Sequence, residues 1–214
     1  MRLFCFQFLI GTVLIVSQTL AQNNKRDSAD IEGMARILDK YAHEVMNSND
    51  VKEKQNSVRF YFQTFPDNFE TFSAVYDSRR NVEEWLPPLV KHALFDILPS
   101  LREIIPENEY YEKLIGVGIG GFWNADNVGA LSHHLWQLIP ENITLSIRVL
   151  EEYEEKEIRS FWYFLYDGPH PEHPFNRKHY EELYPRIRDN NPHIAEQLKQ
   201  AYEQLLSEND GHGH

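Results

Sequence analysis

The chain has 214 residues, of which 33 are acidic and 21 are Lys or Arg, and its net charge is −12. The length suits one domain, and a hydrophobic content of 42% is that of an ordinary globular protein rather than a disordered or fibrous one. Because binding to phosphate groups needs a basic face, the acidic balance excludes nucleic acid as a partner.

A short apolar segment begins the chain. Arg2 is followed by a nearly continuous apolar run over residues 3–16, and small residues then lead up to Ala21. This is the layout of a secretory signal peptide, and the run of about 14 residues is shorter than the roughly 20 that span a membrane. We therefore predict a signal peptide over residues 1–21, cut near Ala21, and a secreted or periplasmic protein without a membrane span. An uncleaved membrane anchor is the alternative.

The only cysteine is Cys5, which lies inside that apolar run. Cleavage would leave a chain without cysteine. Such a chain forms no disulfides and has no thiol nucleophile and no cysteine-based zinc site.

Apolar residues recur at spacings of three and four along the body of the chain, which predicts amphipathic helices. The predicted helical stretches are 31–45, 58–65, 69–76, 89–98, 110–115, 128–138 and 194–205, and residues 143–153 and 155–166 form two helices or one bent helix. Asp50 and Asp126 are expected as N-terminal caps, and Pro66 is expected in a first helical turn. Pro99 is expected to end or kink its helix, and Pro140 is expected to end its helix.

The sequence predicts an all-α fold of antiparallel helical hairpins, packed as an irregular bundle or a short α-solenoid. Residues 22–206 would form one domain and residues 207–214 a flexible polar tail. The glycines of residues 116–121 lack the Lys-Ser/Thr ending of a phosphate-binding loop. We therefore interpret them as sites where two helices pack closely.

Aromatic residues make up 13% of the chain and point to a binding surface, because aromatic faces stack on sugars and grip peptides. Trp123 lies in a predicted turn between helices, where a large ring is expected to be exposed. The aromatic helix that follows contributes Trp162 and Tyr166. These three residues are the predicted ligand-binding residues.

A proline-rich loop at residues 167–174 contains the candidate metal ligands. His170, His173 and His179 follow one another closely and could join Asp167 or Glu172 around one divalent metal. The spacing matches no His-Glu-x-x-His motif, and a rigid surface connector is the alternative interpretation. No other cofactor is expected.

No catalytic motif stands out elsewhere. There is no Gly-x-Ser-x-Gly element, and His134 falls on an apolar helix face, where we expect a buried histidine bonded to a neighbour. We therefore expect an exported binding module for a protein, peptide or glycan. The alternatives are a metal-dependent hydrolase with its site at residues 167–179 and a structural role in the cell envelope.

Overall fold

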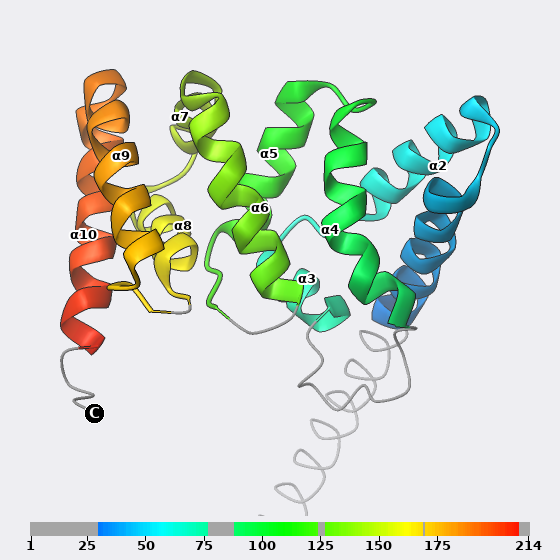
Figure 1. The fold of residues 1–214 in the computed structure, drawn as a ribbon, viewed down its shortest axis with the longest axis horizontal. Helices are drawn as coiled ribbons and strands as arrows, with labels where there is room; N and C mark the ends of the chain where they lie inside the picture. Colours follow the sequence, from blue (N-terminus) through cyan, green and yellow to red (C-terminus); the bar gives the residue numbers. More distant parts are fainter. Residues whose placement is uncertain (1–29, 77–87, 124–126, 169, 210–214) are drawn as a thin grey trace, which may run out of the picture.

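The computed structural model describes residues 30–76, 88–123, 127–168 and 170–209, although the side chains of residues 88–93, 127 and 209 are left undescribed (Figure 1). The predicted signal peptide and the predicted cap Asp126 lie outside the described residues. Within the described residues the regular structure is entirely helical, which confirms the predicted all-α fold.

Residues 30–47 form the first described helix. The helices that follow are α2 (Val51–Thr64), α3 (Phe69–Tyr76), α4 (Pro88–Arg102), α5 (Glu107–Gly118), α6 (Asn127–Glu141), α7 (Ile143–Leu150), α8 (Glu155–Tyr166), α9 (Pro174–Asn190) and α10 (Pro192–Asn209). Among the described residues, none of these helices combines the length and the apolar character that crossing a bilayer requires.

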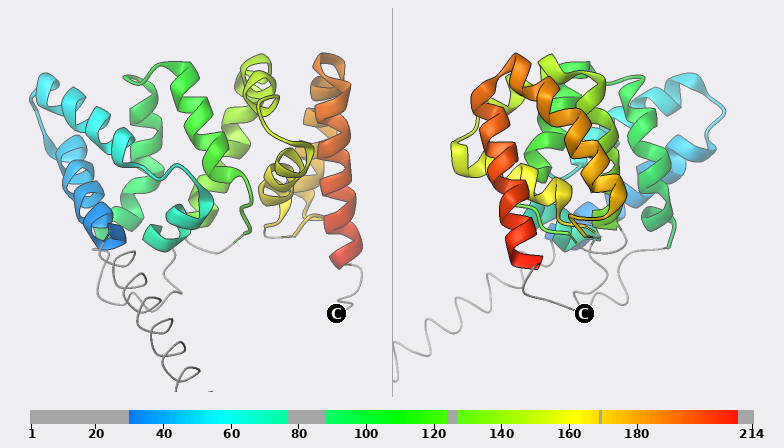
Figure 2. Two further views of the ribbon diagram at one scale, coloured as in Figure 1. Left: turned by 180° about the vertical axis from the view of Figure 1, so that it is seen from behind. Right: turned by 60° about the vertical axis from the view of Figure 1, so that its left-hand side comes forward.

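The helices progress along the long axis of the molecule in the order of the chain, except that α3 lies between α4 and α5 (Figures 1 and 2). Each helix from α2 to α8 contacts the helix two places later, so that α2 packs on α4, α3 on α5, and so on to α8 on α10. This is the near-neighbour contact pattern that stacked helical hairpins produce.

Side-chain caps mark the places where the chain reverses direction. Asp50 begins α2 and accepts a hydrogen bond from the backbone N–H of Glu53 at 2.9 Å, as the sequence predicts. Asn142 is the single residue between α6 and α7, and Asn191 is the single residue between α9 and α10. Each accepts a backbone N–H of the helix that it begins, which satisfies a donor that a helix leaves unpaired.

The structure differs from the predicted position of Pro66 and from the prediction that Pro140 ends its helix. Pro66 precedes α3 rather than lying in it, because Asn68 caps that helix by accepting the backbone N–H of Thr71 at 2.9 Å. Pro99 and Pro140 lie inside α4 and α6, close to the end of each helix. A proline there removes only one hydrogen bond of the last turns, so the helix continues past it.

Two further boundaries concern the C-terminal half. Residues 143–166 form two helices, with Glu154 and Glu157 making a capping box at the start of α8. α10 continues to Asn209, so the start of the predicted flexible tail at residue 207 is helical instead.

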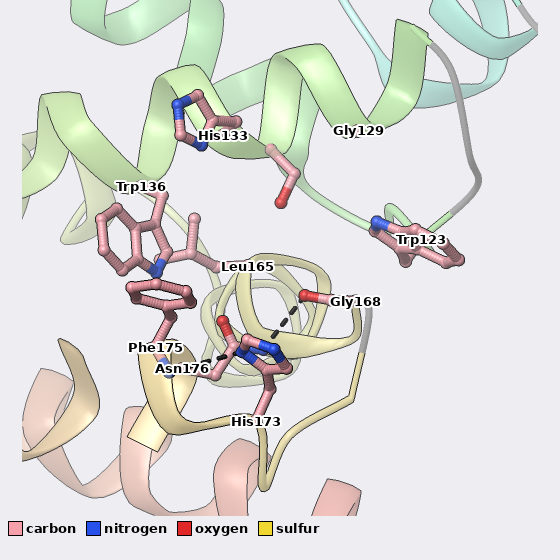
Figure 3. A pocket seen from close by; sticks show the side chains of 10 residues that line it. Trp123, Gly129, His133, Trp136, Leu165, Gly168, His173, Phe175 and Asn176 are labelled. Atoms are coloured by element: carbon pink, nitrogen blue, oxygen red, sulfur yellow. Dashed lines mark hydrogen bonds between the residues drawn. The ribbon is translucent and has the colours of Figure 1, made fainter. Parts of the chain in front are cut away.

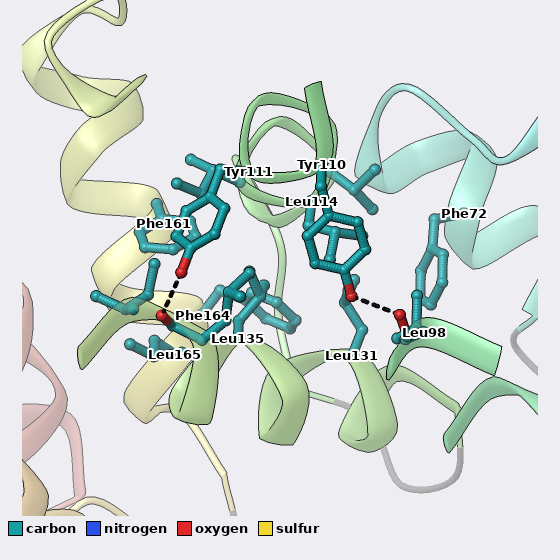
Figure 4. Close-up of a cluster of buried hydrophobic side chains, with 14 of the residues drawn as sticks. Phe72, Leu98, Tyr110, Tyr111, Leu114, Leu131, Leu135, Phe161, Phe164 and Leu165 are labelled. Atoms are coloured by element: carbon teal, nitrogen blue, oxygen red, sulfur yellow. Dashed lines mark hydrogen bonds between the residues drawn. The ribbon is translucent and has the colours of Figure 1, made fainter. Parts of the chain in front are cut away.

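The buried core extends from Ala35 to Leu205, and part of it lies where α5 contacts its neighbours (Figure 4). Tyr110 and Tyr111 are fully buried there, and their hydroxyls donate to the carbonyl oxygens of Leu98 in α4 and Leu138 in α6. A Cβ on Gly118 would lie 2.9 Å from the ring of Phe161 in α8. The prediction of close helix packing is thus confirmed at Gly118, whereas Gly120 lies beyond the end of α5 with a φ of 70° and has nothing within 4 Å of an added Cβ.

Candidate functional site

A cavity of about 520 Å³ lies between α6 and the connection from α8 to α9 (Figure 3). On one side the cavity is lined by Leu165 of α8 and by Gly168 of the connection. The N-cap residue His173 and the first turn of α9, with Phe175 and Asn176, complete this side. We call this cavity the α6–α9 pocket. Its two large walls are Trp123 and Trp136, which lie on opposite sides of it (Figure 3).

One face of α6 forms the wall that contains Trp136. Gly129, Ser132, His133 and Trp136 are spaced by three, four and seven residues, which places them on one side of a helix. The predicted apolar stripe of α6, which includes Leu135, is buried in the core instead. The helix therefore presents one face to the core and a second face to the pocket.

Trp136 is held in place by His179 of α9. The two rings stack with 3.8 Å between their centroids, and His179 Nε2 lies 3.1 Å from the carbonyl oxygen of Trp136. Because a carbonyl only accepts, Nε2 carries the proton, and Nδ1 accepts the hydroxyl hydrogen of Tyr166 at 2.9 Å. Burial lowers the pKa of His179 to about 4. The charge of Arg186 also lowers this pKa, whereas the hydrogen bond to Trp136 raises it, and the ring is neutral at pH 7.

Trp123 rests against the end of α8. Its backbone N–H donates to Asp167 Oδ2 at 2.7 Å, and a Cβ on Gly168 would overlap its indole ring. Glycine at position 168 therefore leaves the space that the ring occupies. Burial raises the pKa of Asp167, and the hydrogen bond from Trp123 opposes this rise.

The connection from α8 to α9 is tied down from two sides. Asn176 Nδ2 donates to the carbonyl oxygens of Gly168 and His170, both at 3.0 Å. From α10, the hydroxyl of Tyr202 donates to the carbonyl oxygen of Pro171 at 2.9 Å. These bonds hold the floor of the pocket in one conformation.

Among the described residues that line the α6–α9 pocket there is no Asp, Glu, Lys or Arg, in a chain of which 25% of the residues are charged. The ionisable groups of this described lining are His133 and His173, both exposed. Moving a charge out of water is costly without a partner, so this pocket favours an uncharged, largely apolar group. Two smaller cavities, of about 390 and 440 Å³, are lined by carboxylates such as Glu70 and Glu112.

The pocket does not present a nucleophile with its base. The hydroxyl of Ser132 makes no hydrogen bond to another described residue, and the ring of the adjacent His133 bonds to Gln137 instead. Nucleophilic catalysis needs a hydroxyl in hydrogen-bond reach of a base, and this pair does not provide that contact.

The structure separates the three predicted ligand-binding residues. Trp123 lines the pocket and is 37% exposed. Trp162 and Tyr166 are completely buried and lie in the core, because their helix α8 packs against α6 and α10 on that side. Tyr166 still influences the site through its hydrogen bond to His179, which supports Trp136.

The predicted metal ligands are each engaged in other contacts. His170 and His173 accept the backbone N–H groups of Glu172 and Phe175, and both ring nitrogens of His179 are hydrogen-bonded. Asp167 accepts the backbone N–H of Trp123. Within the described ranges, no three His, Cys, Asp or Glu side chains lie together in a way that could hold a metal ion.

Sequence reasoning missed Ser132, Trp136, Phe175 and Asn176. A signal for two of them was available, because residues 129, 132, 133 and 136 share one helix face. The contribution of α9 depends on contacts between distant parts of the chain and leaves no local pattern.

No protein family, curated protein or solved structure matches this chain. The geometry of the site is therefore the basis for the functional proposal.

Proposed function

We propose that the protein acts by binding, and that the α6–α9 pocket takes a bulky uncharged side chain of a peptide or protein segment. The observation that carries this proposal is an aromatic-walled cavity in which the lining residues that the structure describes include no Asp, Glu, Lys or Arg. Its volume of about 520 Å³ falls within the range of small-ligand sites and leaves room for one large side chain.

The aromatic lining reaches the molecular surface, which favours a chain over a small molecule. Phe175 lines the cavity and is nevertheless 70% exposed. A peptide that places one side chain in the pocket can cover the exposed part of this ring with its neighbouring residues. Aromatic residues of this kind are enriched among those that dominate binding energy at protein interfaces.

The net charge of the protein indicates which charge to expect on the residues of the bound peptide that flank its anchor side chain. A net charge of −12 attracts cationic chains and repels anionic ones over the range of a few ångströms to a Debye length. We therefore propose an uncharged anchor side chain with Lys or Arg beside it.

The pocket is less suited to a glycan. Buried sugar hydroxyls each need a hydrogen-bond partner, and the side chains that line this cavity supply few such groups besides Ser132, Asn176 and the two histidines. A peptide side chain makes fewer demands of this kind.

The direct test is a titration of ¹⁵N-labelled protein with the peptide acetyl-Lys-Lys-Trp-Lys-Lys-amide, followed on the tryptophan indole N–H resonances. We expect the resonances of Trp123 and Trp136 to shift, and that of the buried Trp162 to stay in place. The matched peptide with Ala in place of Trp should cause much smaller shifts. Equal shifts with both peptides, or none with either, would remove the proposal.

A pair of exposed phenylalanines provides matched protein variants. Phe175→Ala removes a ring of the pocket, whereas Phe60→Ala removes a ring that is 48% exposed and stacked on Tyr41, far along the chain. The first variant should weaken binding of the Trp peptide about tenfold, and the second should leave it unchanged.

A further inference from the structure

The amide of Asn176 has a fixed orientation. Its side chain is only 6% exposed, and both of its N–H groups donate to the carbonyl oxygens of Gly168 and His170. Because those carbonyls only accept, the nitrogen must face the connection and the oxygen must face away from it. Figure 3 shows the oxygen on the side of the pocket.

The pocket thus contains an acceptor that no described residue pairs with and that remains open to the cavity. Among the described residues, none donates a hydrogen bond to Asn176 Oδ1, and this oxygen is not among the fully buried atoms. The same holds for the hydroxyl of Ser132, a residue that is 7% exposed and lines the same cavity. A side chain that fills the pocket takes both groups out of water, so a group of the ligand is expected to pair with them.

We propose that the side chain held in the α6–α9 pocket is that of Trp or Tyr, and that its N–H or O–H donates to Asn176 Oδ1. This inference rests on the proposed function. The ring fills the space between Trp123 and Trp136, and the polar hydrogen meets Asn176 Oδ1, an acceptor whose direction the fold determines. Ser132 can then accept from or donate to the same group, since a hydroxyl does both.

The same arrangement disfavours other side chains. Phe and Leu fill the cavity but leave Asn176 Oδ1 unpaired in a closed complex. Carboxylates and phosphates only accept and would bring a negative charge against that oxygen. A site built to bond a polar hydrogen discriminates strongly against an analogue that lacks it, because the buried partner then loses water without a replacement.

The test uses the peptide acetyl-Lys-Lys-X-Lys-Lys-amide in matched pairs. Benzothienylalanine has the ring shape of Trp with sulfur in place of the N–H, and Phe is Tyr without its hydroxyl. We expect the dissociation constant to rise about tenfold from Trp to benzothienylalanine and about tenfold from Tyr to Phe. Equal affinity within both pairs would overturn the inference.

The two proposals fail in different ways. If the Trp and benzothienylalanine peptides bind equally but both bind better than the Ala peptide, the pocket binds bulky side chains and only the inference of a hydrogen bond to Asn176 fails. If Trp binds no better than Ala, the proposed function is lost as well.

A protein variant gives an independent readout. Asn176→Leu keeps a side chain of similar size but removes the acceptor, so the preference for Trp over benzothienylalanine should disappear. Ser132→Ala is a control variant with a smaller expected effect, because α6 needs no hydrogen bond from that hydroxyl. It should retain at least part of the preference for Trp over benzothienylalanine. If Asn176→Leu folds and keeps the full preference, Asn176 is not the acceptor. If it does not fold, the peptide pairs on the unmodified protein still decide the question.

Discussion

The imidazole of His179 stacks on the indole of Trp136 with an angle of 21° between the ring planes. His179 is also hydrogen-bonded to Tyr166, which is completely buried in the core. The neutral His179 therefore contacts both Tyr166 in the core and Trp136 in the wall of the pocket.

Replacing His179 with Ala should destabilise the protein by about 2–4 kcal/mol. The variant leaves the buried hydroxyl of Tyr166 without a partner and opens a space beneath Trp136. Urea unfolding followed by circular dichroism measures the loss. His133 also lies parallel to Trp136 but is exposed, so His133→Ala should change stability by less than about 0.5 kcal/mol. Equal effects of the two variants would contradict this assignment.

Stability should fall as the pH drops from 6.5 towards 4. Burial lowers the pKa of both His134 and His179 to about 4, whereas an unfolded chain has histidines near 6.5. Between these values the unfolded state binds more protons, so the stabilisation is complete above pH 6.5 and is lost as the pH falls to 4. The loss reaches at most about 3 kcal/mol per histidine.

Thermal melts at half-unit pH intervals test this dependence. His179→Gln removes one of the two titrating groups, so its melting temperature should vary less steeply between pH 4.5 and 6.5. A slope equal to that of the unmodified protein would show that His179 is not one of the groups responsible.

Two helical glycines should respond to alanine in opposite directions. A Cβ on Gly118 would lie 2.9 Å from the ring of Phe161 and 3.2 Å from Leu135, so Gly118→Ala should cost about 1–3 kcal/mol. Gly33 has nothing within 4 Å of the added atom, so Gly33→Ala should stabilise by up to about 1 kcal/mol. Denaturant unfolding of both variants measures the difference, and a neutral Gly118→Ala would show that α5 and α8 can separate freely.

Gly168→Ala should weaken peptide binding with little change in the rest of the fold. The new methyl group would occupy the position of the Trp123 indole, so that ring must move out of the pocket wall. The indole N–H resonance of Trp123 should shift, and the dissociation constant of the Trp peptide should rise about tenfold. An unchanged dissociation constant would mean that Trp123 does not contact the ligand.

Divalent metals should leave the melting temperature unchanged in a chain shortened at residue 210, which lacks the terminal Gly-His repeat. The nitrogens of His179 are hydrogen-bonded on both sides, and His170 and His173 accept backbone N–H groups. A ligand present at 100 times its dissociation constant would add about 2.7 kcal/mol, which a melt detects readily. A rise with Zn²⁺ that His170→Ala and His173→Ala abolish together would restore the metal-dependent hydrolase.

Local sequence was sufficient to predict the helices but not the pocket. The apolar spacing in residues 31–45 and 194–205 reflects burial against neighbouring helices, and a cap such as Asp50 involves only residues close in sequence. The pocket instead depends on the contact between Trp136 and His179, which are 43 residues apart. Such a contact has no periodic signature.

Trp162 illustrates the same limit for a single residue. Its exposure depends on whether α8 lies at the surface or between other helices, and packing against α6 and α10 buries it completely. The sequence around Trp162 is as rich in aromatic residues as that of a binding surface. Only the neighbours of α8 distinguish the two cases.

The packing of each helix on its near neighbours also affects how the protein opens in solution. The hairpin of residues 30–47 and α2 lies at the opposite end of the molecule from α9 and α10 (Figure 1), and α2 packs on α4, so we expect this hairpin to unfold while α8, α9 and α10 stay folded. Amide hydrogen exchange should then differ between the two ends of the molecule. A bound ligand would slow exchange in α6, α8 and α9 and leave the rate in the first hairpin as it was.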